Sequence, residues 1–475
     1  MKTFNVMLAD YIDDETLRGD VKFHSGIAAT GWNLFGVPLS GNVRLFDILY
    51  EDYNLCPYED GDEYKGIPTG QAYLDEDGDI VDYLLVDSYN HPARLKYSAT
   101  SDNLLISSLR LAKSPALNFE IPDIGEYVFS NGFYIFKVVD GWDKRFVLYI
   151  LRSRKIKDFI DNNIYRGIGI SAYMAADLLK IQIRNLPLAE QQKALDSITA
   201  IENKIKALKK EMRPEQFIID DIIARNFKLY RKMINEIDDI KVVTAPLREL
   251  SFINSNLRNS VRWAKASLIQ EKMLLMCDSF ERLGKHILKT RNGFSPDCYE
   301  GASATSVLGL DSLNKNTVLN IDDTKYTDMV ISSERDCYVK NGDFFISRGN
   351  TTDLVALASI ATLAEDTEPI IFPDIMIRID FGASVDKQYM AYIFNSFIGR
   401  LYFKYAAKGK NQTMVKVSSK ELNDFYVPLP PLSEQRRIAN EINLSIEKQN
   451  ILKSQITALR IQIDDIIENT LTNGI

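Results

Sequence analysis

The sequence predicts a mixed α/β protein in which two globular domains are joined by two long helices that form an antiparallel coiled coil, with pseudo-two-fold internal repetition. Three observations lead to this prediction. A helical segment of 40 residues occurs twice, each copy follows a region of mixed strand and helix patterns, and apolar residues recur in both copies at coiled-coil spacing. The chain is therefore expected to be a duplication whose function is also two-fold.

The repeated helical segment is the clearest feature of the chain. Residues 188–227 align without a gap with residues 432–471, which lie 244 positions further on, and 12 of the 40 pairs are identical. The identical pairs include three positions of the motif LxEQ at the start and the whole run IDDII near the end. Upstream, LLIS at 104–107 corresponds to FFIS at 344–347. The repeat therefore covers most of the chain.

Length and composition are those of a protein with two medium-sized domains. The chain has 475 residues, of which 45% are hydrophobic and 26% are charged, and both fractions are typical of globular proteins. The pattern predicts four segments: a first globular domain at 1–187, a first long helical region at 188–241, a second globular domain at 242–431 and a second long helix at 432–475.

Each globular segment combines β-rich runs with helical stretches. The β-rich runs are YVFSNGFYIFKVV at 127–139 and PIIFPDIMIRIDF at 369–381. Helical patterns follow at about 145–162 and 386–402. Glycine, proline, Asn and Asp clusters separate these elements, so we expect mixed α/β domains.

Apolar positions in the two long helices step by four and three residues, which predicts a coiled-coil seam. Forty helical residues extend roughly 60 Å at about 1.5 Å per residue, a length that suits a spacer between domains. Pro214 is expected to kink or restart the first helix near Arg213, with Pro214 in the new first turn. The alternative is a long helix in an ordinary bundle. The predicted pairing residues are Ile198, Ile201, Ile205, Leu208, Ile219, Ile222, Ile442, Leu452, Ile456, Leu459, Ile463 and Ile466.

The sequence lacks the common catalytic and metal-binding motifs. There is no GxxxxGK[ST], HExxH, GxSxG or GxGxxG motif and no [ND]PP[YF] motif of DNA methyltransferases, so we expect no catalytic residues and no bound cofactor. The four cysteines form no CxxC pair and the three histidines lie far apart, so no metal site is predicted. No stretch approaches the roughly 20 apolar residues that span a membrane, and the expected location is the cytoplasm.

Three strings carry a resemblance to a known family. YVPLPPLSEQRRIANEI at 426–442, NGDFFISRGNTTD at 341–353 and NLPLAEQQKAL at 185–195, together with the terminal coiled coil, resemble the specificity (S) subunits of Type I restriction-modification systems. The resemblance implies two target recognition domains that read a bipartite double-stranded DNA sequence and two helices that fix the gap between its halves. It also implies methyltransferase (M) subunits that carry S-adenosylmethionine and methylate adenine, a motor-nuclease (R) subunit for cleavage, and a role in phage defence.

Candidate DNA-binding residues combine forked donors, amides and lysines, which suit base edges and phosphates. The loop SRGNTTD supplies three of them, and a basic stretch that also contains Tyr402, Tyr405 and Lys416 supplies more. A basic run with Lys157 occupies the corresponding place in the first domain. The alternative for each residue is a solvated helix face or loop. The candidates are Arg348, Asn350, Thr351, Lys404, Lys408, Lys410, Asn411, Gln412, Arg152, Arg154, Lys155 and Arg166.

The charge distribution departs from that of a simple DNA-binding chain. Residues 1–87 contain 5 Lys and Arg against 18 Asp and Glu, whereas residues 88–187 contain 14 against 9, and the whole chain has a net charge of −8. The first segment should therefore avoid DNA, and it is a candidate docking face for partner subunits. Two alternatives remain: an acidic scaffold or decoy that binds methyltransferase subunits without reading DNA, and a DNA-modifying enzyme without the usual motifs.

Overall fold

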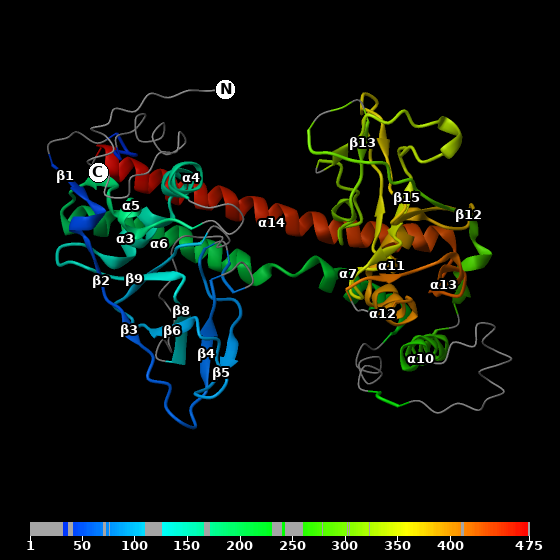
Figure 1. Cartoon of the computed structure of the whole chain (residues 1–475), viewed down its shortest axis with the longest axis horizontal. Coiled ribbons are helices and arrows are strands. Elements are labelled where there is room, and N and C mark those ends of the chain that lie inside the picture. Colours follow the sequence, from blue (N-terminus) through cyan, green and yellow to red (C-terminus); the bar gives the residue numbers. More distant parts are fainter. Residues whose placement is uncertain are drawn as a thin grey trace. The chain divides into compact units, whose positions relative to one another are not determined.

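The computed structural model describes residues 32–36, 41–69, 73–75, 77–109, 126–165, 172–229, 240–242, 260–277, 279–301, 303, 305–322, 324–409 and 413–473. The chain divides into two compact units. Unit 1 consists of Met1–Glu211 and Ser454–Ile475, and unit 2 of Met212–Lys453. Both units mix strands with helices and include parts of the long helices, so the predicted mixed α/β fold class is confirmed (Figure 1).

The described residues of unit 1 form three sheets with strand orders β2-β9-β7, β3-β6-β8-β4-β5 and β1-β10. Its strands are β1 (Asn42–Arg44), β2 (Leu49–Glu51), β3 (Asn54–Leu55), β4 (Tyr64–Ile67), β5 (Leu84–Val86), β6 (Leu95–Ser98), β7 (Leu104–Ser107), β8 (Tyr127–Ser130), β9 (Phe133–Val138) and β10 (Gln182–Arg184). Its helices are η1 (Leu45–Asp47), α3 (Lys144–Arg152), α4 (Arg154–Phe159), the π-helical turn η3 (Ile160–Ile164), α5 (Ala175–Leu179) and α6 (Leu188–Glu211).

In the part of unit 2 that the structure describes there are four sheets, with strand orders β12-β19-β15-β17, β14-β13-β18, β11-β21 and β16-β20. Its strands are β11 (Phe280–Arg282), β12 (Ile287–Asn292), β13 (Ser306–Val307), β14 (Lys325–Tyr326), β15 (Phe344–Ser347), β16 (Gly349–Asn350), β17 (Ala358–Ile360), β18 (Ile370–Ile371), β19 (Met376–Phe381), β20 (Val415–Lys416) and β21 (Tyr426–Pro428). Its helices are α7 (Glu215–Phe227), α10 (Val261–Met276), η4 (Leu283–Lys285), η5 (Leu310–Ser312), η6 (Ser333–Arg335), α11 (Lys387–Asn395), α12 (Phe397–Ala406) and α13 (Ser419–Asn423). Helix α14 (Leu432–Asn473) contributes its first part to unit 2 and its last part to unit 1.

The two units share a topology as well as a sequence pattern. β7 pairs antiparallel with β9 in unit 1, and β15 pairs antiparallel with β19 in unit 2. The parallel pair β4 and β8 corresponds to the parallel pair β13 and β18. In each unit, the strand that precedes the long helix, β10 or β21, pairs antiparallel with an early strand, β1 or β11. The internal repeat is therefore a repeat of folded units.

Each helical stretch predicted after the β-rich runs is two helices rather than one. Ser153 separates α3 from α4, and Ser396 separates α11 from α12. Both serines adopt extended backbone angles, and both hydroxyls donate to a carbonyl three residues back, at 2.6 Å to Ile150 and 2.8 Å to Ile393. Both predicted stretches are thus helical with one interruption, because these serines satisfy the backbone locally and allow a new helix to begin.

The first long helix breaks where proline predicted it would. α6 ends at Glu211 and α7 begins at Glu215, with Pro214 as the N-cap of α7 rather than in its first turn. The Oε1 of Gln449, a buried residue of α14, accepts a hydrogen bond of 2.8 Å from the backbone N–H of Arg213. The polar seam residue Gln449 therefore satisfies a donor that the helix break leaves without a helical partner.

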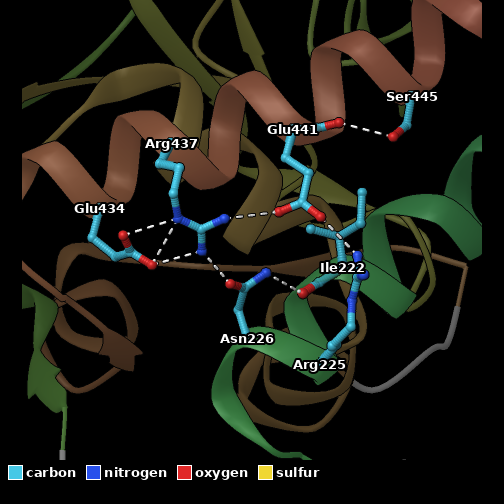
Figure 2. A network of polar contacts seen from close by, with 7 residues as sticks. All are labelled: Ile222, Arg225, Asn226, Glu434, Arg437, Glu441 and Ser445. Carbon is cyan, nitrogen blue, oxygen red and sulfur yellow. Dashed lines mark hydrogen bonds and ion pairs between the residues drawn. The ribbon is translucent and has the colours of Figure 1, made fainter.

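Within unit 2, α7 and the first part of α14 run antiparallel. Glu215 pairs with Lys453 at 2.7 Å, whereas Arg225, ten residues later, pairs with Glu441 at 2.7 Å. Figure 2 shows the second of these pairs within a network in which Arg437 also binds Glu441 at 3.1 Å. The residue numbers rise along one helix as they fall along the other, as antiparallel packing requires.

The core of each unit includes both long helices. In unit 1, Ala194, Leu195 and Ile198 of α6 share a hydrophobic core with Ile467 and Leu471 of α14. In unit 2, apolar residues of α7 share a core with Ile438, Ala439 and Ile442 of α14. Of the predicted pairing residues, Ile198, Ile205, Ile219, Ile222, Ile442, Leu452 and Ile456 are buried, and Ile201, Leu208, Leu459, Ile463 and Ile466 are half-buried. No helix in the described ranges has the length and hydropathy needed to cross a membrane.

Candidate nucleic-acid interface

In unit 2, the structure brings together the two stretches that the sequence singled out for DNA binding. β16, in the loop SRGNTTD, pairs antiparallel with β20, in the basic stretch, so that Gly349 lies opposite Lys416. A further bridge joins Lys408 to Lys416, with backbone hydrogen bonds of 2.7 and 2.8 Å. Beside this pair, Met414 is half exposed. We call the segments 348–351, 408–409 and 413–417 the unit 2 ribbon, and the predicted residues Lys410, Asn411 and Gln412 lie outside the described residues.

Arg348 lies at the start of the ribbon and is partly held in place. Its Nη1 donates to the backbone carbonyl of Asp374 at 3.2 Å and lies 3.9 Å from the carboxylate of the same residue. The side chain is 34% exposed, so part of the guanidinium still faces solvent. Asn350 and Thr351 are half-buried, and the Oδ1 of Asn350 accepts a hydrogen bond of 2.8 Å from the backbone N–H of Thr351. The side-chain amide nitrogen of Asn350 therefore takes no part in this hydrogen bond.

The lysines of the ribbon differ in how they are held. Lys408 Nζ lies 2.7 Å from Glu421 Oε1, and Glu421 is buried. Burial acts to raise the pKa of Glu421, but hydrogen bonds from Lys408 and Ser418 outweigh this effect and lower the pKa. Lys416 is exposed, and it is held in the ribbon by its backbone, opposite Gly349 and Lys408. Lys416 is therefore better placed than Lys408 for a contact with a phosphate.

Lys404 and the tyrosines beside it belong to α12 rather than to the ribbon surface. The backbone carbonyl of Lys404 accepts a hydrogen bond of 2.6 Å from Arg262, and its Nζ lies 5.4 Å from the centroid of the Tyr405 ring. Tyr402 and Tyr405 are buried, and Tyr402 stacks on Phe425 with 4.7 Å between ring centroids. These aromatic rings form part of the core and are not a stacking surface for bases.

Unit 1 has a counterpart of the ribbon at the equivalent place. Leu109, which aligns with Gly349, forms a bridge with Ala172, which aligns with Lys416. Tyr173 N–H donates to the Ser108 carbonyl at 3.2 Å, just as Val417 N–H donates to the Arg348 carbonyl at 2.8 Å. Ser108 therefore occupies the backbone position of Arg348. The flanking residues 110–125 and 166–171, including the predicted Arg166, lie outside the described residues.

The other basic candidates of unit 1 contact the long helices instead. The backbone N–H of Arg154 donates to Asp464 Oδ1 at 3.2 Å, and Lys155 forms an ion pair with Glu468, both on α14. Arg152 lines a cavity that α6 and α14 also border. The structure does not bring these three residues to the bridge between Leu109 and Ala172. They lie where α3 and α4 pack against the long helices.

A cluster that sequence reasoning missed joins the acidic first segment of the chain to the long helices of unit 1. The side chains of Asp75, Asp77 and Asp79 lie close together, and across the described ranges this is the one group of three potential metal ligands. Lys209 of α6 pairs with Asp75 at 2.9 Å, and Arg460 of α14 pairs with Asp77 at 2.8 Å. The carboxylates are thus already bound by side chains of the chain itself.

The electrostatics of this cluster favour ionised carboxylates. Burial acts to raise the pKa of Asp77, but hydrogen bonds from Arg460 and Lys209 outweigh it and lower the pKa to about 2. The alternating acidic residues of DEDGD were visible in the sequence, but their partners lie 134 and 383 residues away along the chain. No local pattern could have identified them.

Comparisons with known proteins give structural similarities at low sequence identity. No family model matches the chain, and no curated protein matches it. A chain from a study of complex assembly and conformational transition of the type I R-M system is 15% identical, with a TM-score of 0.45, over 92% of this chain and 99% of that one. The HsdS subunit from Thermoanaerobacter tengcongensis is 15% identical, with a TM-score of 0.34, over 92% and 98%.

A third similar structure is the Type-I restriction-modification system S subunit from M. genitalium. It is 12% identical, with a TM-score of 0.38, over 91% of this chain and 96% of that one. Solved structures similar to nearly the whole of this chain thus include S subunits. Since all these TM-scores lie below 0.5, the similarities by themselves assign neither a family nor a function to the chain.

Proposed function

We propose that this chain is the DNA-specificity subunit of a Type I restriction-modification complex. In this proposal each unit reads one half of a bipartite double-stranded DNA target, and the long helices set the gap between the halves and dock adenine methyltransferase subunits. The chain itself catalyses nothing, S-adenosylmethionine belongs to the methyltransferase subunits, and a motor-nuclease subunit joins for cleavage in the cytoplasm. The motifs SRGNTTD and LPPLSEQ, which resemble those of S subunits, support this assignment.

The single observation that carries the proposal is that the first aspartate of each copy of the run IDDII accepts a backbone hydrogen bond from a globular unit. In unit 1, Asp464 of α14 accepts the backbone N–H of Arg154 at the start of α4. In unit 2, the equivalent Asp220 of α7 accepts the backbone N–H of Phe397 at the start of α12. Each end of the helical repeat is therefore built into a globular unit. This arrangement suits a two-headed reader in which helix length fixes the distance between half-targets.

The ribbon of each unit supports the assignment of one reading surface to each half-target. The unit 2 ribbon carries Arg348, whose forked donor suits a guanine edge, and Lys416, whose ammonium group suits a phosphate. The equivalent bridge in unit 1 has Ser108 at the position of Arg348, so the two units present different chemistry at the same place. Different side chains on equivalent frameworks are what two unlike half-targets require.

The decisive experiment exchanges one globular domain. Residues 242–430 are replaced by the equivalent domain of a related S subunit, and adenine methylation is mapped on genomic DNA from cells that also carry the methyltransferase subunits. We expect one half of the modified sequence to change and the other half to stay the same. A second variant, with equal insertions in both long helices, should alter only the gap. If both halves of the target change together, the modular assignment is wrong.

A second candidate, an acidic scaffold or decoy, follows from the excess of acidic residues in the first 87 positions. Such a protein would bind methyltransferase subunits through its helices and read no DNA. The mobility of the assembled complex on DNA of random sequence distinguishes the two functions. A specificity subunit enriches one bipartite sequence in the bound fraction, whereas a decoy enriches none.

A further inference from the structure

The short segment 372–375, which leads into β19, lies directly beside Arg348 in unit 2. The backbone N–H of Arg348 donates to the Ile375 carbonyl at 2.7 Å, and its Nη1 donates to the Asp374 carbonyl at 3.2 Å. Both the backbone and the side chain of Arg348 are thus tied to this segment. The proposed function assigns no role to the side chain of Asp374, which is 54% exposed.

The carboxylate of Asp374 is held by Ser295, which lies just after β12. The hydroxyl of Ser295 donates to Asp374 Oδ1 at 2.6 Å and accepts the backbone N–H of Asp374 at 3.1 Å. The other carboxylate oxygen, Oδ2, lies 3.9 Å from Nη1 of Arg348. One oxygen is therefore fixed by Ser295, and the other attracts the guanidinium group.

The backbone beneath these two side chains is closely packed. Phe294 N–H donates to the Phe372 carbonyl at 2.9 Å. The neighbouring Gly293 approaches so closely that a Cβ there would lie 2.0 Å from the same carbonyl oxygen, so glycine is required. Phe372 and Pro373 are buried. The exposed side chains of Ser295 and Asp374 therefore stand on a fixed framework.

The contact with Asp374 leaves one edge of the Arg348 guanidinium group for a ligand. Among the described residues, Nε and Nη2 of Arg348 make no hydrogen bond, and neither is among the nitrogens that protein atoms cover completely. These two nitrogens form one edge of a planar fork, and such an edge matches O6 and N7 of guanine. A hydrogen bond from Nη1 to a fixed carbonyl holds that edge in one orientation.

Unit 1 has the same framework without this pair of side chains. The sheet registers place Asn131 where unit 2 has Asp374, and Ser108 N–H donates to the Gly132 carbonyl at 2.9 Å. The Ser108 hydroxyl donates to the same carbonyl at 2.8 Å. Asn131 is exposed, and within the described part of unit 1 no hydrogen bond holds its side chain. Of the two equivalent places, it is thus the one in unit 2 that orients an arginine with a carboxylate.

We propose that Asp374, held by Ser295, is a positioning residue that orients Arg348 toward a guanine in the half-target of unit 2. The inference rests on the proposed function of the chain as a DNA-reading subunit. An arginine side chain that nothing holds occupies many rotamers, and ordering it on binding costs free energy. Because Asp374 reduces this cost for one orientation of Arg348, it should sharpen the preference for guanine without contacting a base itself.

The test measures methyl transfer by the assembled complex to its target duplex and to duplexes with single base-pair changes. The ratio of kcat/KM values gives the discrimination at each position. Arg348→Ala identifies the base pair that this residue reads, by a loss of discrimination of about tenfold or more. Asp374→Ala should lower discrimination at the same pair about two- to fivefold, as for an exposed ion pair, and Ser295→Ala by less. The double variant of Arg348 and Asp374 should match Arg348→Ala, because Asp374 acts only through Arg348.

Asp366→Ala, which removes an exposed carboxylate of the same unit, is the matched control and should leave discrimination unchanged. A merely structural role of Asp374 would lower the unfolding temperature and slow methyl transfer to every duplex equally, and that result would overturn the inference. Wild-type discrimination in Asp374→Ala, a loss at a different base pair, or an additive loss in the double variant would also overturn it while the bipartite target persists. A wild-type complex without any bipartite preference would overturn the proposed function, and this inference with it.

Discussion

Gln191 and Gln435 make the same set of three hydrogen bonds, one set in each unit. Each Oε1 accepts the backbone N–H of the aspartate that caps α3 or α11, and each Nε2 donates to two backbone carbonyls, one before that cap and one before the long helix. The glutamine thus holds the start of a long helix against the start of α3 in unit 1 and of α11 in unit 2. The bonds join Gln191 to Asp143 N (2.8 Å), Gly141 O (3.0 Å) and Leu186 O (2.8 Å), and Gln435 to Asp386 N (2.9 Å), Ser384 O (2.9 Å) and Pro430 O (2.8 Å).

Gln435→Ala should destabilise unit 2 by about 2 to 4 kcal/mol, because three hydrogen bonds are lost and buried backbone groups remain unpaired. Gln435 is 1% exposed, so water cannot easily replace the side chain. Amide hydrogen exchange read by mass spectrometry should show faster exchange in α11 and little change in α3. Gln192→Ala is the control, since Gln192 is exposed and its amide bonds to Asp196 one turn along the same helix. Equal loss of protection in both units would contradict the assignment.

Asp220→Ala should weaken the start of α12 by about 1 to 2 kcal/mol, as expected for the loss of a helix cap. Asp220 Oδ1 accepts the Phe397 N–H at 2.7 Å and is buried. The neighbouring Asp221 is exposed, so Asp221→Ala makes the same change in charge without removing the cap. Hydrogen exchange of residues 397–400 measures the difference. Asp464→Ala and Asp465→Ala form the corresponding pair for α4, and the same contrast is expected there.

Acid should weaken unit 1 through Asp77. Its pKa is lowered from 3.8 to about 2 in the folded chain, so the folded state binds its proton less readily than the unfolded state. The stability from Asp77 is therefore complete above pH 3.8 and is lost as the pH falls toward about 2. It amounts to at most about 2 kcal/mol. Urea unfolding of the wild type and of Asp77→Asn should converge over that range, and a constant difference would refute the linkage.

Lys416→Ala should weaken binding of the assembled complex to all DNA sequences about equally, because a phosphate contact carries no base information. The slope of log K against log salt should become shallower by about 0.9. Binding measured at several salt concentrations on target and non-target DNA checks both points. An unchanged slope would remove Lys416 from the DNA interface.

Lys408→Ala should behave differently from Lys416→Ala, because Lys408 also neutralises the buried Glu421. We expect a loss of stability in unit 2 of about 1 kcal/mol, since the ammonium group is half exposed. The double variant Lys408→Ala with Glu421→Gln should recover part of that loss. Thermal unfolding of the three variants is the measurement, and the absence of recovery would show that the ion pair contributes little.

Arg348→Ala should relax the preference at one base pair of a single half-target, by about 1 to 3 kcal/mol of discrimination. The side chain is tethered to Asp374 but remains partly exposed, so it can reach a base edge without a large rearrangement. Methylation mapping of cells carrying the variant measures the preference at each position. Arg436→Ala, which removes an exposed charge on α14, should leave the target unchanged. A uniform loss across all positions would instead indicate a phosphate contact.

Local sequence signals predicted the long helices of this protein well. The motif LxEQ marks the first turn of α6 and of α14, and Pro214 marks the break before α7. Proline lacks a backbone donor and the apolar spacing is a property of a single helix, so both signals act within a few residues. The β-rich runs predicted β8, β9 and β19 for the same reason.

The candidate site was only partly predictable, because its members meet through contacts between distant segments. The sequence selected the loop of Arg348 and the stretch around Lys416, but the pairing of β16 with β20 is what joins them. The basic run of Arg152 and Lys155 looked like a second phosphate surface, yet their neighbours are residues of α6 and α14. Residue types alone do not distinguish a lysine that faces solvent from one that faces a distant glutamate.

The sequence by itself determined that the chain is a duplication of a mixed α/β unit with a long helix, because repetition and apolar periodicity are properties of the residue order alone. Only the tertiary structure decided which carboxylates, Asp464 and Asp220, cap the helices that begin after Ser153 and Ser396. It also decided which charges are neutralised internally, such as Asp77 by Arg460. The carboxylate caps and the ion pair of Asp77 join groups that lie 177 to 383 residues apart along the chain, and their energies arise only when the folded chain brings these groups within hydrogen-bonding distance.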